Sequence, residues 1–299
     1  MPTSISQLRV RDLVPDFLSL LDECGQVPAR DWPGLWRARY VGRHPEVFAE
    51  LDREGEWSRP DDLAAVLARL RDCGADLAAR STAVRALLPE SVASVADAMG
   101  WVGDGDPLDC VVLVGLHRAN GWADRLDGRF GLFLAVEELG PPGNDRLLVL
   151  HEAAHVVHDR LAATRDWPSH GVANSLLSEG LATQVSAETA PGLPDEEYLW
   201  FGRPGHRAWL DGCRARWPEI LGRIDADLDA TDVEHHAAYF LMRDSPHAAD
   251  LPKRCGYLVG WEIVRRLRAR HPLAEIARWP LDRGLREVHR ALRALRAGA

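Results

Sequence analysis

The chain has 299 residues, 46% of them hydrophobic, so it is long enough to bury a large core as one domain or as two subdomains. Its net charge of −9 and its isoelectric point near 5.7 argue against a surface that binds nucleic acid or anionic membranes. No apolar run reaches the ~18 residues of a membrane-spanning helix. The opening stretch MPTSISQLRVRDLVPDFL has neither an uninterrupted apolar segment nor a cleavage signature.

The cysteines indicate a reducing environment. They are odd in number, scattered along the chain and never spaced as CxxC: Cys24, Cys73, Cys110, Cys213 and Cys255. This usage predicts reduced thiols in a cytoplasmic protein, and it argues against a disulfide framework or a thiolate zinc site.

Residues 1–106 are predicted to form a helical subdomain, because apolar residues recur there at helical spacing. The predicted helices follow Pro15, Asp31 and Asp61-Asp62, and the second ends near His44-Pro45. Their apolar faces are Phe17, Leu18 and Leu21; Trp32, Leu35, Trp36 and Tyr40; and Leu63, Val66, Leu67 and Leu70. We interpret the aromatic residues as core, with substrate binding as the alternative. The GDGDP stretch lacks the remaining ligands of a calcium loop and is predicted to be a turn.

Residues 107–190 are predicted to be the central part of the fold, and they begin with strands. The runs LDCVVLVGL and RFGLFLAVEEL are apolar and β-branched, and Asn120-Gly121 and Asp127-Gly128 between them are turn signals. We expect the strand around Gly131–Val136 to be a sheet edge, to which an extended peptide would add through main-chain hydrogen bonds. A strand covered on both sides is the alternative. The stretch Pro141-Pro142-Gly143-Asn144 is expected to end the sheet.

A helix beginning near Asp145 carries the strongest chemical pattern in the chain, HEAAH. His151 and His155 are four residues apart, which on a helix is ~40° of rotation and ~6 Å of rise, so both imidazoles leave one face. Two neutral imidazoles so placed can bind one Zn²⁺ and leave room for a third protein ligand and a water. Glu152 is turned partly off that face, where its carboxylate is a candidate general base for the water.

The third ligand must come from outside this pattern. The extension HExxHxxGxxH fails, because His158 stands at the glycine position and Leu161 at the last histidine position. Glu179 in SEGLAT follows His155 by 24 residues, and the turn-like stretch 165–171 can return a second helix antiparallel to the first. We expect Glu179 near the start of that helix, pointing at the histidines. The alternatives are a carboxylate favoured there by the helix dipole, and His158 as a ligand.

Residues 191–299 are predicted to be a helical subdomain. The expected helices lie within Glu196–Trp217, stopped by Pro218; from Thr231-Asp232 through His235, His236, Tyr239 and Phe240; over Lys253–Arg270; and over 273–297 with Leu281, Leu285, Val288, Leu292 and Leu295 as its apolar stripe. The many arginines of the last two helices are interpreted as a solvated face.

Hydrolysis at such a centre also requires a donor to the developing oxyanion. Tyr257 is the first candidate, because the glycines at 256 and 260 let a helix start close to the cleft. The alternatives are Arg254, His235, His236 and Tyr239. Hydrogen-bond acceptors behind the two histidines should orient the imidazoles, and the candidates are Asn174, Ser178 and Gln184.

HEAAH followed by SEGLAT resembles the gluzincin branch of the zincin metallopeptidases. The later segment LPKRCGYLVGWEIVRRL is similar to one found in DUF2268 proteins, a bacterial group of predicted Zn-dependent proteases in which HExxH, EGLA and a GYxxG-type motif follow one another. The likeness covers roughly residues 108–270, with a weaker echo in the N-terminal segment. It implies a zincin-like fold in which a small sheet precedes the HExxH helix.

Together these patterns predict an α+β, mainly α fold of the gluzincin type, with a helical C-terminal part. The predicted function is zinc-dependent hydrolysis of peptide or protein substrates, with His151, His155 and Glu179 binding Zn²⁺, Glu152 as base and Tyr257 as oxyanion donor. One alternative is a zinc hydrolase of the same fold acting on a non-peptide, biosynthetic substrate. The other is an inactive zincin that serves as a binding or regulatory module, although such a protein has no need to keep Glu152.

Overall fold

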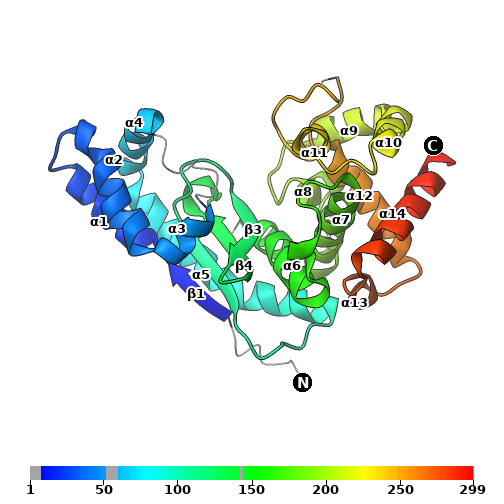
Figure 1. Cartoon of the computed structure of the whole chain (residues 1–299), viewed down its shortest axis with the longest axis horizontal. Coiled ribbons are helices and arrows are strands. Elements are labelled where there is room, and N and C mark those ends of the chain that lie inside the picture. The colour runs from blue at the N-terminus through cyan, green and yellow to red at the C-terminus, as the bar shows by residue number, and fades with distance from the viewer. Residues whose placement is uncertain (1–7, 52–59, 142–143, 249, 299) are drawn as a thin grey trace. The chain divides into compact units, whose positions relative to one another are not determined.

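The computed structural model describes residues 8–51, 60–141, 144–248 and 250–298. They form an α+β fold that is mainly helical and has one four-stranded sheet, as the sequence predicted at this coarse level (Figure 1). In these residues no helix is long and apolar enough to cross a membrane. Pro142 and Gly143 of the predicted sheet-ending stretch lie outside the described residues.

Contacts divide the chain into two compact units. One combines the described parts of Ile5–Pro89 and Gly105–Asp145 and contains the sheet; the other combines Glu90–Asp104 with Arg146–Ala299 and is helical. This grouping is not the three consecutive segments, 1–106, 107–190 and 191–299, that were predicted from the sequence. Those segments stay a prediction about the organisation of the chain.

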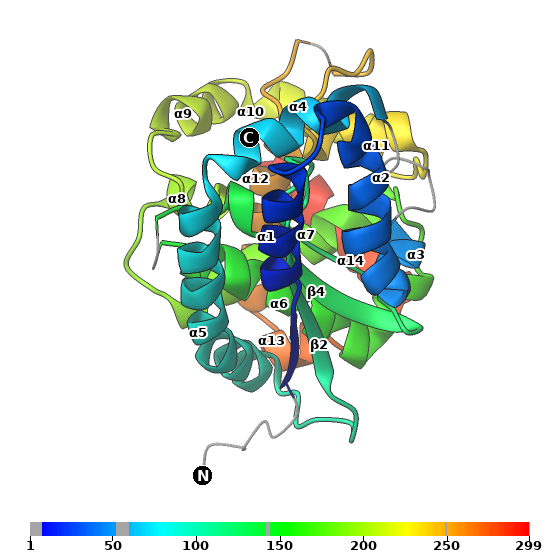
Figure 2. The ribbon, with the colours of Figure 1, turned by 90° about the vertical axis from the view of Figure 1, so that its left-hand side faces the viewer.

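The sheet has the strand order β1-β2-β4-β3. Its strands are β1 (Leu8–Asp12), β2 (Leu108–Leu113), β3 (Gly121–Leu126) and β4 (Arg129–Ala135). β2 pairs in parallel with β1 and with β4, which lies beside it in Figure 2. Every residue of β2 is buried, including Asp109, whose carboxylate accepts hydrogen bonds from Arg9.

The prediction that the strand around Gly131–Val136 forms an edge was wrong. That strand is β4, and it lies between β2 and β3. Asp127 and Gly128 both adopt positive φ angles, 52° and 81°, which suit a tight hairpin turn, and this turn folds β3 back along the outer side of β4. The edges are therefore β1 and β3, two strands whose polar residues kept them from being recognised in the sequence.

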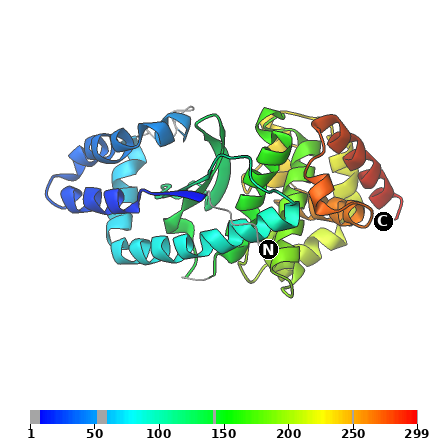
Figure 3. The ribbon, with the colours of Figure 1, turned by 90° about the horizontal axis from the view of Figure 1, so that it is seen from below.

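The sheet-containing unit has an aromatic cluster among its first helices. β1 runs directly into α1 (Val14–Cys24), which is followed by α2 (Trp32–Leu35), the short π-helix η2 (Trp36–Tyr40), α3 (Pro45–Leu51), α4 (Pro60–Arg71) and α5 (Gly74–Met99), whose part from Glu90 onward belongs to the helical unit (Figure 3). Phe17, Trp36, Tyr40 and Phe48 contact one another edge to face or tilted and are almost fully buried. The core interpretation of these aromatic residues is confirmed. Asp31 precedes α2, but its side chain makes no capping hydrogen bond.

The helical unit contains the HEAAH and SEGLAT patterns. Its helices are α6 (Arg146–Ala162), α7 (Val172–Thr189), α8 (Asp195–Leu199), α9 (Arg207–Ala215), α10 (Trp217–Ala226), α11 (Val233–Phe240), α12 (Cys255–Arg268), α13 (Leu273–Ile276) and α14 (Leu281–Arg296). Asp232 caps α11 by accepting from the backbone N–H groups of Glu234 and His235, as predicted.

Proline corrects two of the predicted helix boundaries. Pro218 stands in the first turn of α10 rather than ending a helix, because proline at that position lacks only a donor that would be unpaired anyway. The single helix predicted over 273–297 is two helices, because Pro280 separates α13 from α14.

Helices α7 and α12 lie side by side at very close range (Figure 1). A Cβ atom on Gly180 would stand 2.1 Å from the carbonyl oxygen of Gly260, and one on Gly260 would stand 2.5 Å from that of Leu176. Only glycine at both positions lets the two backbones approach so closely. This contact gives a physical reason for the glycines of SEGLAT and of the GYxxG-type segment, and it brings the helix carrying Glu179 against the helix carrying Tyr257.

Candidate metal centre

Helix α6 directs both histidines of HEAAH to one point. The Nε2 atoms of His151 and His155 are 3.2 Å apart, with the rings edge to face, as the four-residue spacing predicted. His151 is only 1% exposed, and His155 is partly exposed. His155 therefore lies on the partly exposed side of the pair, while His151 is held inside the protein.

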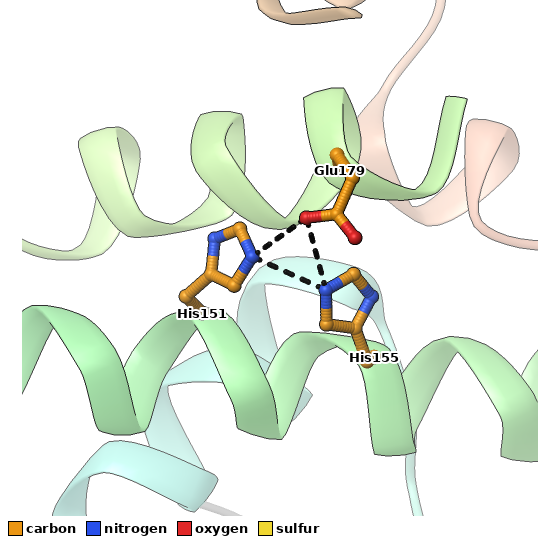
Figure 4. A group of neighbouring side chains, drawn as sticks. All are labelled: His151, His155 and Glu179. Atoms are coloured by element: carbon orange, nitrogen blue, oxygen red, sulfur yellow. Dashed lines mark hydrogen bonds and ion pairs between the residues drawn. The ribbon is translucent and has the colours of Figure 1, made fainter. Parts of the chain in front are cut away.

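Helix α7 supplies the third group. Ala163 adopts a left-handed conformation with φ 52°, and the chain then turns and enters α7 after Gly171. Glu179 points from α7 toward the histidines, with Oε2 3.0 Å from Nε2 of His151 and 3.5 Å from Nε2 of His155 (Figure 4). The expectation that Glu179 lies near the helix start was wrong, because α7 begins at Val172, about two turns earlier. This position also weakens the helix-dipole interpretation, since that effect is confined to the first turn.

The three side chains form a triangle suited to one metal ion. One ligand atom from each of His151, His155 and Glu179 lies within 4.8 Å of the others, and the nearest separations are 3.0, 3.2 and 3.5 Å. Ligands bound tetrahedrally to zinc at ~2.0–2.1 Å stand about 3.3–3.4 Å from one another, which is the scale of this triangle. The group found here is thus the one predicted from the sequence, and it is close enough to hold a metal ion.

Charge and burial act on the three groups in opposite directions. Burial lowers the pKa of His151 to about 4. Burial would also lower that of His155, but the charge of Glu179 and its hydrogen bond outweigh this effect and raise the pKa to about 9. Burial would raise the pKa of Glu179, but the two histidines bring it well below the usual range. The carboxylate is therefore ionised at neutral pH, as a metal ligand must be.

Glu152 lies beside this centre without being one of the three converging groups. It is 6% exposed, and burial raises its pKa to about 7, an effect that the positive charges of His155 and Arg254 reduce. A divalent cation in the centre would lower this pKa further. A carboxylate whose proton affinity is set near neutrality can accept a proton and release it again.

An aromatic layer covers the His151 side of the centre. The ring of Phe201 stands 4.5 Å from that of His151, and the ring of Tyr257, in the first turn of α12, stands 6.2 Å from it. Burial and the charge of Glu179 raise the pKa of Tyr257, so its phenol keeps its proton at neutral pH. Phe201 was not recognised from the sequence. It follows α8 with φ 55°, and although Gly202 and Pro204 signal a turn there, nothing in the sequence shows that this turn brings Phe201 to the histidines.

The alternative candidates have other contacts. His158 is 2% exposed and lies edge to face against Trp167. It does not belong to the metal-binding group found among the residues that the structure describes. Tyr239 donates its hydroxyl hydrogen bond to Asp227, and His235 bonds to Asp232. His236 stacks on Phe240, whose ring lies edge to face against that of Tyr257.

Two of the three proposed orienting residues, Asn174 and Gln184, have other partners. The side chain of Asn174 donates to the carbonyl of Pro168, and that of Gln184 donates to Glu188 and accepts from Trp261. Within the described part of the chain, Nδ1 of His151 has no hydrogen-bond partner. The side chains of Asn174 and Gln184 are therefore engaged elsewhere, and nothing in the sequence signalled these contacts.

Comparison of the chain with models of protein families gave no match. Searches among curated proteins and among solved structures likewise gave no match. The gluzincin and DUF2268 resemblance therefore rests on the sequence patterns alone.

Proposed function

We propose that this protein is a zinc-dependent metallopeptidase of gluzincin type. The observation that carries the proposal is the triangle of His151, His155 and Glu179, because two imidazoles and a carboxylate are a donor set that zinc prefers in catalytic sites. The five cysteines, all of them free thiols, support a cytoplasmic location for it.

The residues around the triangle have the properties that peptide hydrolysis requires. A zinc ion, when bound, lowers the pKa of water and polarises a carbonyl group. Glu152 would take the proton from the attacking water and pass it to the nitrogen of the leaving amine, and its raised pKa suits both transfers. Tyr257, protonated at neutral pH, would donate a hydrogen bond to the carbonyl oxygen as that oxygen gains charge.

Two variants separate metal binding from catalysis. Zinc content is measured in purified wild-type protein, in Glu179→Ala and in Glu152→Gln, and hydrolysis of a randomised peptide library is followed by mass spectrometry. We expect Glu179→Ala to lose most of the zinc, and Glu152→Gln to keep it while losing hydrolysis by a factor of about 10²–10⁴. Glu188→Gln changes a glutamate near the C-terminal end of the same helix. It is the matched control and should resemble the wild type in both measurements.

Three results would count against the proposal. Equal zinc in the wild type and in Glu179→Ala would remove Glu179 from the ligand set. Full turnover by zinc-loaded Glu152→Gln would remove the base. A zinc-loaded wild-type protein that cleaves no peptide but hydrolyses other esters or amides would instead favour a zinc hydrolase with a non-peptide substrate.

A further inference from the structure

Arg254 lies in a cage of aromatic rings beside the candidate centre. Its guanidinium carbon is 4.2 Å from the ring centre of Tyr257, 4.8 Å from that of Trp200 and 4.9 Å from that of Phe201. Trp200 is itself held by a parallel stack on His206, at 3.8 Å between ring centres. The rings hold the guanidinium in one place and contact its faces, so the N–H groups at its edge are left to bind another group.

No acidic side chain of the described residues forms an ion pair with Arg254, although its charge acts on the carboxyl of Glu152. Among the residues that the structure describes, Arg254 forms no ion pair, its Nε is buried without a partner, and its one hydrogen bond is a long one of 3.4 Å to the carbonyl of Leu199. The stacked arginines Arg265 and Arg283 differ in this respect. Arg283 lies 4.7 Å from the ring centre of Trp279 but also pairs with Glu275 at 2.7 Å. A half-buried guanidinium has five N–H donors, so a site that leaves most of them unused favours an incoming anion.

The cage shares two walls with the metal centre. Phe201 and Tyr257 contact Arg254 on the one hand and lie within 4.5 and 6.2 Å of the His151 ring on the other. One aromatic side chain therefore separates the guanidinium from a candidate ligand. In a peptide, a carbonyl carbon and the carboxylate carbon of the next residue are roughly 3–4 Å apart. A substrate carbonyl at the centre would thus bring a neighbouring carboxylate toward Arg254.

The backbone holds Arg254 in this position at a cost. Arg254 is the residue before α12 and has φ 63°, a left-handed conformation that non-glycine residues rarely adopt. Phe201, which contacts it, has φ 55°. Rare backbone conformations of this kind persist where the surrounding structure enforces them, and they are concentrated at functional sites. Two of them in contact beside the candidate centre support a functional role for Arg254.

We propose that Arg254 binds a carboxylate group of the substrate. This inference rests on the proposed peptidase function, and it gives the substrate class of that site: peptides with a negative charge next to the scissile bond. The carboxylate has two possible sources, the free C-terminus of a peptide or an acidic side chain. The first would make the protein a carboxypeptidase, and the second would give it a preference for aspartate or glutamate.

The test compares binding of matched peptides that differ in one charge. Zinc-loaded Glu152→Gln protein, in which bound peptides are not expected to be consumed, is dialysed to equilibrium against pools of N-acetylated tetrapeptides, and bound peptide is counted by mass spectrometry. One pair of pools has a C-terminal acid or an amide. A second pair, both amidated, has glutamate or glutamine at each position in turn. The same binding measurements are repeated with Glu152→Gln protein that carries a second substitution, which is Arg254→Gln, Arg254→Lys or, as the control, Arg283→Gln.

We expect one pair to show a preference for the charged member of about 10- to 100-fold, the range of a charge-assisted hydrogen-bonded pair. The preference should disappear with Arg254→Gln, fall in part with Arg254→Lys, which keeps the charge without the planar fork, and persist with Arg283→Gln. The pair that responds identifies the source of the carboxylate. Equal binding of charged and neutral peptides before any change at Arg254, or a preference that survives Arg254→Gln, would overturn the proposal.

The binding readout also separates this inference from the peptidase proposal. A wild-type protein that cleaves no peptide, while the Glu152→Gln protein binds acids through Arg254, refutes the peptidase and supports carboxylate binding. A wild-type protein that cleaves the charged and neutral members of both pairs equally well, and loses all of these activities equally with Arg254→Gln, assigns Arg254 to the oxyanion and refutes carboxylate recognition.

Discussion

The close contact between α7 and α12 makes Gly180→Ala a severe perturbation for one methyl group. The new Cβ would stand 2.1 Å from the carbonyl oxygen of Gly260 and 2.9 Å from a methyl group of Val264. An ordinary contact needs about 3.4 Å or more, so the helices would have to separate by roughly 1 Å. The obstructing atom belongs to a backbone, and no side-chain rotation can relieve the clash.

The magnitude follows from two opposing effects. Overpacking of a tight interface costs about 1–3 kcal/mol, and a clash with a rigid backbone belongs at the upper end of that range. Alanine in place of glycine inside a helix returns about 1 kcal/mol through helix propensity. We therefore expect Gly180→Ala to lower the free energy of unfolding by about 2 kcal/mol. Because Glu179 precedes this residue, zinc affinity should fall as well.

The assay is urea-induced unfolding, with Gly212→Ala as the matched control. Gly212 lies inside α9, and nothing lies within 4 Å of the Cβ that alanine would add there, so propensity alone acts and that variant should be stabilised by about 0.5–1 kcal/mol. If Gly180→Ala is as stable as Gly212→Ala and keeps full zinc affinity, the argument that the two glycines position the centre is refuted.

Three further predictions concern the centre and its surroundings. Tyr257→Phe should lower kcat by about 10²–10³ with little change in KM, measured on the best peptide of the library, because it removes a donor to the developing oxyanion. Removal of the metal with a chelator should lower Tm, and added zinc should restore the Tm of the wild type but not of Glu179→Ala, since a ligand that binds only the folded state stabilises it. The free energy of unfolding should fall as the pH drops from about 6.5 toward 3, because burial lowers the pKa of His158 to about 3 and only the unfolded chain then takes up its proton. At pH 5 this one group costs about 2 kcal/mol relative to pH 7, and a His158→Leu variant should show a correspondingly flatter dependence on pH in urea unfolding.

The metal-binding group could be read from the sequence because its geometry is largely local. The spacing of His151 and His155 places both rings on one helix face whatever the rest of the fold. The short turn after α6 then brings α7, with Glu179, back beside these histidines. The central strands β2 and β4 were recognisable for a similar reason, since their apolar runs at 110–113 and 131–135 report burial on both faces.

Features that depend on distant parts of the chain were not readable from the sequence. The strand order that makes β1 and β3 the edges depends on pairing between segments that are far apart in the chain. The sequence of one segment does not show which other segment it will pair with. The contacts of Asn174, Gln184 and Tyr239 were likewise decided by neighbours from other elements.

Helical spacing by itself determined which imidazoles share a face, and the turn signals determined that a second helix returns with Glu179. Only the tertiary structure decided that Glu179 reaches them from the middle of α7, and that Arg254 stands among Trp200, Phe201 and Tyr257 without an ion pair to any residue that the structure describes. The physical reason is that side-chain direction along a helix follows from a fixed 100° step per residue, whereas the approach of α12 to α7 depends on two glycines 80 residues apart that are matched only in three dimensions.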